Sequence, residues 1–149
     1  MSKIIDLYYK IWVDCLVRLR SQDKNKSDWR EKGMIMITIA MTFNFMLFMA
    51  ILERGMLGCY FYKLSFPSLS DRFNNVLSIL VLHFLPIAII NYLLIFRKRR
   101  YWKLIKKYPY YNGKLAVPYF TISLLLPVIL LFVYIIATQD VTFWSFFGK

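Results

Sequence analysis

Residues 76–96 read VLSILVLHFLPIAIINYLLIF, and residues 97–107 continue directly as RKRRYWKLIKK. The first run contains no Asp, Glu, Lys or Arg, and it is long enough to cross a bilayer as a helix, which takes about 20 residues. An apolar helix that ends in positive charge is typical of a membrane span with its charged end in the cytoplasm. We therefore predict one continuous helix over residues 70–107, with a span at 74–96 and a cytoplasmic extension at 97–107. The extension carries only basic charges: Arg97, Lys98, Arg99, Arg100, Lys103, Lys106 and Lys107.

The composition favours a membrane protein over a soluble one. The chain has 149 residues, of which 59% are hydrophobic, and a mean hydropathy of +0.49. The net charge is +12, but the basic residues flank apolar stretches instead of covering a polar face. This pattern favours contact with anionic lipid headgroups, and it argues against nucleic acid as a partner.

Two further apolar stretches, 34–52 and 115–138, have the length of membrane spans. We predict an all-α integral membrane protein with three transmembrane helices, in which residues 1–149 form a single membrane domain. An N-terminal amphipathic helix is expected over residues 3–20.

The expected N-terminal helix has one narrow polar stripe at a spacing of three and four residues, and charges of opposite sign alternate along it. This spacing allows Asp6 to pair with Lys10, and Asp14 with Arg18. The remaining surface is apolar and includes Trp12. Two interpretations stay open: a helix that lies among the lipid headgroups, or a docking helix that buries its apolar face against a partner or a second copy. The stripe consists of Lys3, Asp6, Lys10, Asp14 and Arg18.

Lys and Arg are distributed unevenly among the segments between the spans. The region through Lys32 has eight and the second loop has eight, whereas the first loop has three and the tail has one. The positive-inside rule then predicts a multi-pass protein of the inner (plasma) membrane, with the N-terminus in the cytoplasm and the C-terminus outside. Cys15 and Cys59 fall on opposite sides of the membrane in this topology, so we expect no disulfide between them.

A few polar residues lie within the apolar stretches, where a polar side chain is costly unless it faces protein. Thr38 and Thr42 share one helix face, and Asn44 lies on nearly the opposite one. The first span is therefore expected to contact protein on two sides. We interpret His83, the one histidine in the sequence, as a hydrogen-bonding partner between helices rather than a functional group. The residues predicted to make polar packing contacts inside the membrane are Asn44, His83, Asn91 and Thr121.

The sequence offers no arrangement typical of catalysis. It contains no acidic residue within the spans, no Ser/His/Asp set and no cluster of metal ligands. We therefore expect a protein that is not an enzyme, with no catalytic residues, no metal and no cofactor.

The segment Asn91-Tyr92-Leu93-Leu94, the basic run after it and Tyr101-Trp102-Lys103-Leu104-Ile105-Lys106-Lys107-Tyr108 resemble the uncharacterised small multi-span membrane proteins of bacteria. The resemblance implies a membrane location, and it assigns no activity to the chain because those proteins have no known activity.

These observations predict a non-catalytic membrane subunit or scaffold that assembles into a homo-oligomer or a complex with another membrane protein. The alternative is a homo-oligomeric pore or a membrane-disrupting effector of the defence type. A membrane immunity protein is a variant of the first function.

Overall fold

The computed structural model describes residues 3–22, 28–53, 64–68 and 70–138, and every regular element in these ranges is helical. Two of the segments, η2 and η3, are π-helical, and η4 is a 3-10 turn. The elements in order are α1 (Lys3–Gln22), α2 (Trp29–Ile51), α3 (Asp71–Ser78), η2 (Ile79–Phe84), α4 (Leu85–Asn91), η3 (Tyr92–Phe96), η4 (Arg97–Arg99), α5 (Arg100–Lys107) and α6 (Ala116–Thr138).

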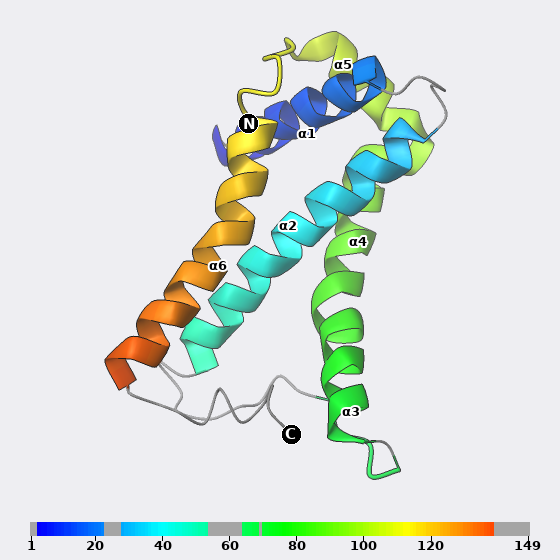
Figure 1. Ribbon diagram of the computed structural model, residues 1–149. Coiled ribbons are helices and arrows are strands. Elements are labelled where there is room, and N and C mark those ends of the chain that lie inside the picture. Colours follow the sequence, from blue (N-terminus) through cyan, green and yellow to red (C-terminus); the bar gives the residue numbers. More distant parts are fainter. Residues whose placement is uncertain (1–2, 23–27, 54–63, 69, 139–149) are drawn as a thin grey trace.

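Three long rods and two crossing helices make up the fold (Figure 1). The rods are α2, the run from α3 to η3, and α6. The middle rod is α2, which contacts both α6 and α4. At the upper end in Figure 1, α1 and α5 lie across the rods, and α1 contacts α2, α5 and α6.

Two helical runs are long and apolar enough to cross a membrane: Trp29–Ile51, and Asp71–Lys107 counted across its breaks. The first begins five residues before the predicted span at 34–52, directly after Asp28. A third apolar helix, α6, occupies Ala116–Thr138, where the sequence predicts a span over 115–138.

The start of α3 lies close to the predicted start of the long helix at residue 70. In the structure Ser70 is the N-cap, and its hydroxyl accepts a hydrogen bond from the Phe73 amide at 3.4 Å. Asn74 and Ser78 then bind the backbone of the preceding loop at Phe66 and Leu64.

The prediction of one continuous helix over residues 70–107 is wrong at its basic end. Lys98 and Arg99 both have φ 55°, in the left-handed region, and they interrupt the helix between η3 and α5. The break turns α5 away from the rod, and Tyr101 is buried against Phe96 and Trp29, with ring centroids 5.9 and 5.8 Å away. Burial of this aromatic side chain offsets the cost of the strained backbone. Hydropathy does not predict the break, because it does not show where Tyr101 packs.

The structure also changes the account of α1. The predicted pair of Asp6 and Lys10 is present at 2.6 Å, whereas Asp14 is fully buried and binds backbone amides instead of Arg18. Trp12 is fully buried within the chain, so its ring has no exposed surface that could contact lipid headgroups. The central part of α1 therefore docks on its own chain, not on a partner.

Two substitutions at Lys98 distinguish a broken helix from a continuous one, because the two structures predict opposite orders of stability for the variants. Lys98→Gly and Lys98→Ala remove the same charge, but only glycine adopts the left-handed region without cost. We expect Lys98→Gly to unfold in detergent with a free energy about 1 kcal/mol higher than Lys98→Ala. A continuous helix would reverse the order, since glycine is about 1 kcal/mol worse than alanine inside a helix.

Candidate functional site

A single carboxylate joins α1 to the start of α6. Asp14 Oδ1 accepts hydrogen bonds from the amides of Tyr111 at 3.1 Å and Gly113 at 2.9 Å. Asp14 Oδ2 accepts from Leu115 at 2.9 Å and Ala116 at 3.0 Å. The first amides of a helix lack partners within it, and the helix dipole favours negative charge there. Asp14 therefore acts as an N-terminal cap for α6 from a distant part of the sequence.

The turn before α6 presents its amides to this carboxylate. Asn112 and Gly113 have φ of 55° and 79°, the left-handed conformation that Asn and Gly adopt most readily. A Cβ atom on Gly113 would collide with the guanidinium of Arg18, so the turn packs closely on α1. The Asn-Gly pair predicts a turn at this position. The sequence does not indicate that Asp14 accepts hydrogen bonds from the backbone amides of this turn.

A second set of contacts joins α1, α2 and α4. The hydroxyl of Tyr8 donates to Oδ1 of Asn91 at 2.8 Å, and the Asn91 amide donates to the Thr38 hydroxyl at 3.1 Å. Asn91 and Thr38 are fully buried. The predicted role of Asn91 in polar packing agrees with this geometry, although its partners come from within the chain.

A third set joins α2 to α6. The amide of Asn44 donates to Ser123 Oγ at 2.9 Å and to the Tyr119 hydroxyl at 3.4 Å. On another side of α2, the Thr38 hydroxyl accepts from Asn91 of α4, while Thr42 donates to the Thr38 carbonyl of its own helix at 2.8 Å. Helix α2 thus contacts protein on two sides, as the sequence predicts, and both neighbours, α6 and α4, belong to the same chain.

The other two predicted polar residues lie in different surroundings. His83 is buried in η2, with Nδ1 3.3 Å from the Ser78 carbonyl and its ring 5.7 Å from that of Phe45. Thr121 is exposed, whereas Ser123 is buried against Asn44. Residues 121 and 123 are two apart and point to different helix faces. Within the chain it is therefore Ser123, and not Thr121, that bonds to α2, and the packing role of Thr121 stays a prediction.

Aromatic rings and guanidinium groups close the end of the molecule where α1, α2 and α5 meet. The guanidinium carbon of Arg20 lies 4.9 Å from the ring centre of Trp102 and 5.9 Å from that of Trp29. Arg30 donates to the Tyr101 hydroxyl at 3.2 Å. These cation–π and hydrogen-bonding contacts fix α5 against the ends of α1 and α2.

The basic residues at the helix break and in α5 carry the charge of this end. All seven are exposed. We call this set the basic surface; it consists of Arg97, Lys98, Arg99, Arg100, Lys103, Lys106 and Lys107.

Two titratable groups of α1 have shifted pKa values. Burial, together with the charge of Asp14, raises the pKa of the Cys15 thiol to about 12. The hydrogen bond from Lys10 lowers the pKa of the Asp6 carboxyl. Within the described ranges, no group of three or more His, Cys, Asp or Glu side chains could hold a metal ion.

Comparisons with known proteins add no family to this description. No protein-family model, no curated protein and no solved structure matches the chain. The resemblance to small bacterial membrane proteins stays a prediction.

Asp14→Asn tests the carboxylate cap. An amide offers one acceptor oxygen and turns a donor toward amides that are themselves donors. We expect the free energy of unfolding in detergent to fall by at least about 2 kcal/mol, because buried donors lose their partners. Asp6→Asn, which removes an exposed carboxylate from the same helix, is the matched control and should have little effect. Equal effects of the two substitutions would contradict the role of Asp14.

The raised pKa of Cys15 makes a separate prediction. In a Cys59→Ser background at pH 8, iodoacetamide should leave Cys15 unmodified until the protein is denatured, because the buried thiol stays protonated. Ser65→Cys places a thiol on an exposed position and shows that the reagent is active. Rapid alkylation of Cys15 in the folded protein would mean that α1 is not packed as described.

Proposed function

We propose that the chain is a non-catalytic integral membrane subunit or scaffold, with α2, the α3–η3 rod and α6 as three spans. The N-terminus, α1 and α5 lie in the cytoplasm, and the C-terminus lies outside the inner (plasma) membrane. The observation that carries the proposal is the separation of surfaces. Large apolar side chains are exposed along the rods, whereas the exposed basic surface gathers at one end.

The apolar exposure favours a bilayer over water as the surroundings of the rods. Soluble proteins seldom expose contiguous apolar patches larger than a few hundred Å². Here exposed side chains recur on each rod, so a large apolar area would meet water outside a membrane. Examples with at least half of the side chain exposed are Ile35 and Phe48 on α2, Val76, Leu80, Leu85, Ile90 and Tyr92 on the α3–η3 rod, and Ile122, Leu125 and Ile129 on α6.

The position of the helix break supports contact with anionic lipid. Because α5 leaves the rod directly after the apolar segment, it lies at the level where the spans meet the headgroups. Each basic residue near an anionic surface contributes about 1 kcal/mol of attraction. The basic surface therefore suits an interfacial helix better than a rod that extends into the cytoplasm.

The polar contacts favour a scaffold over a pore. Thr38 and Asn44 of α2 are turned toward α1, α4 and α6 and are bonded within the chain. They are therefore not available to line an aqueous path between copies. The open row of rods, with α2 in the middle, leaves the outer faces of α4 and α6 for lipid, other copies or a second membrane protein.

Cysteine labelling in cells tests the topology. In the Cys59→Ser background, Ser65→Cys should react with an impermeant maleimide from outside, and Lys107→Cys should react only after the membrane is opened. Both positions are exposed, so packing does not limit either reaction. Cys15 is unsuitable for this purpose because its burial already protects it. Labelling of Lys107→Cys in intact cells would overturn the orientation.

Native mass spectrometry in mild detergent tests assembly. We expect the wild type to appear as an oligomer or with a co-purifying membrane protein. Asn44→Leu should weaken packing of α2 on α6 and so loosen the assembly, while insertion continues because leucine suits hydrocarbon. A wild-type monomer without any partner would contradict the scaffold function. Selective ion conductance of the protein in liposomes would also contradict it, because conductance indicates a pore.

A further inference from the structure

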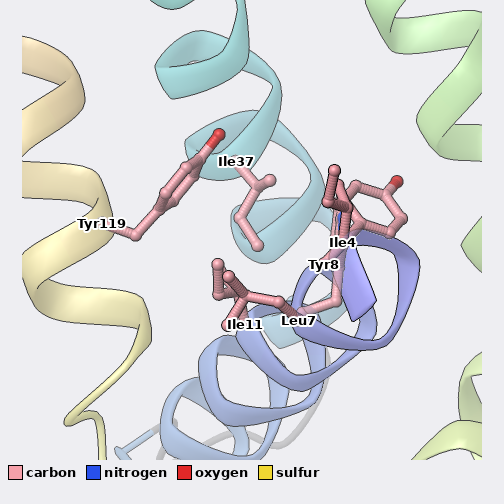
Figure 2. A pocket seen from close by; sticks show the side chains of 7 residues that line it. Ile4, Leu7, Tyr8, Ile11, Ile37 and Tyr119 are labelled. Atoms are coloured by element: carbon pink, nitrogen blue, oxygen red, sulfur yellow. The ribbon is translucent and has the colours of Figure 1, made fainter. Parts of the chain in front are cut away.

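An apolar groove opens between α1, α2 and α6 (Figure 2). Its volume is about 160 Å³. Trp12, fully buried, forms part of its wall, whereas Ile4 and Leu7 are exposed at 78% and 49%. The lining consists of Ile4, Leu7, Tyr8, Ile11 and Trp12 of α1, Ile37 of α2 and Tyr119 of α6.

The polar atoms of the two tyrosines are engaged elsewhere. The Tyr8 hydroxyl is bonded to Asn91, and the Tyr119 hydroxyl accepts from Asn44. Figure 2 shows the Tyr119 hydroxyl directed toward α2 and the Tyr8 hydroxyl turned away from the other labelled side chains. The rings therefore present carbon to the groove, and an occupant has to be apolar there.

The groove lies where the apolar rods meet the charged end. Tyr119 is three residues into α6, about 4.5 Å along its axis, and Ile37 is eight residues into α2, about 12 Å along. In the proposed orientation this is the boundary between headgroups and acyl chains. Exposed apolar residues about one and two turns beyond Tyr119 on α6, Ile122 and Leu126, continue from the groove toward the hydrocarbon.

Exposed basic residues flank the lining residues along the chain. Lys3 directly precedes Ile4 and lies one turn before Leu7 on α1, and Lys114 lies two residues before α6; both are exposed. The acidic residues of this part of α1 are already engaged, since Asp6 pairs with Lys10 and Asp14 binds backbone amides. An apolar groove with an exposed basic rim is complementary to a lipid that carries a negative headgroup.

We propose that this groove holds one acyl chain of an anionic phospholipid, with its phosphate near Lys3 and Lys114. An apolar cavity of about 150 Å³ binds a molecule the size of benzene. The groove therefore holds a short length of one chain, and the rest of the lipid stays in the bilayer. The bound acyl chain would contact α1, α2 and α6 at the same time. This inference rests on the proposed membrane orientation.

The test is native mass spectrometry of the full chain after reconstitution into bilayers of equimolar phosphatidylglycerol and phosphatidylcholine. We expect one retained phosphatidylglycerol per wild-type chain. Leu7→Trp, which fills the groove, should lower the retained fraction at least fivefold. Ile5→Trp is the matched control, because Ile5 is 45% exposed on the same helix but does not line the groove. Combined Lys3→Gln and Lys114→Gln should abolish the preference for phosphatidylglycerol.

A second measurement does not depend on tolerating a tryptophan at position 7. In a background in which Phe replaces the other three tryptophans, Trp29, Trp102 and Trp144, phosphatidylglycerol with dibrominated acyl chains should quench the fluorescence of Trp12. Leu7→Phe should reduce this quenching, whereas Ile5→Phe should not. Equal behaviour of the Leu7 and Ile5 variants in both measurements would overturn the proposal. So would protection of the groove by a second copy, seen as a cross-link from Leu7→Cys to its equivalent.

These outcomes separate the groove from the proposed function. A chain that inserts with the expected labelling of Ser65→Cys and Lys107→Cys but retains no lipid refutes the groove alone. A chain that fails to enter bilayers refutes the membrane function first.

Discussion

The buried carboxylate of Asp14 holds the parts of this fold together. Four backbone amides converge on its two oxygens. Three come from the segment before α6 and one from the first residue of α6, about a hundred positions along the chain. A buried carboxylate is tolerated only when its oxygens are fully hydrogen-bonded, so the helix and the turn require each other. The positions of α1 and of the start of α6 both follow from this contact, and the groove between them depends on it.

The polar side chains inside the rods complete the same arrangement. Asn91 joins α1 to α2 through Tyr8 and Thr38, and Asn44 joins α2 to α6. Each hydrogen bond between helices in a membrane contributes only about 0.6 kcal/mol. Their main effect is to fix which faces of the rods meet. Because these groups have partners within the chain, the case for an oligomer rests on the open row of rods rather than on unsatisfied amides.

Hydropathy and spacing predicted the all-helical fold, the positions of the apolar helices, and the contacts of α2 with protein on two sides. The pair of Asp6 and Lys10 followed from a local spacing of four residues. The partners of Asp14 did not, because they lie far away in sequence and are backbone amides, which no side-chain pattern reveals. The break at Lys98 and Arg99 was missed for a related reason: it depends on where Tyr101 packs. The bond between Ser123 and Asn44 was not predicted either, because only the fold shows which face of α6 meets α2.

Amide hydrogen exchange measured by NMR tests the central role of Asp14 most directly. The first amides of a helix ordinarily exchange fast, because they lack partners within the helix. The account predicts slow exchange for Tyr111, Gly113, Leu115 and Ala116, and fast exchange for Asn112, whose amide does not bind Asp14. In Asp14→Asn the protection should be lost at one pair of amides, either Tyr111 and Gly113 or Leu115 and Ala116, because only one of the two acceptor oxygens remains. Exchange at all four amides as fast as at Asn112 in the wild type would contradict the account.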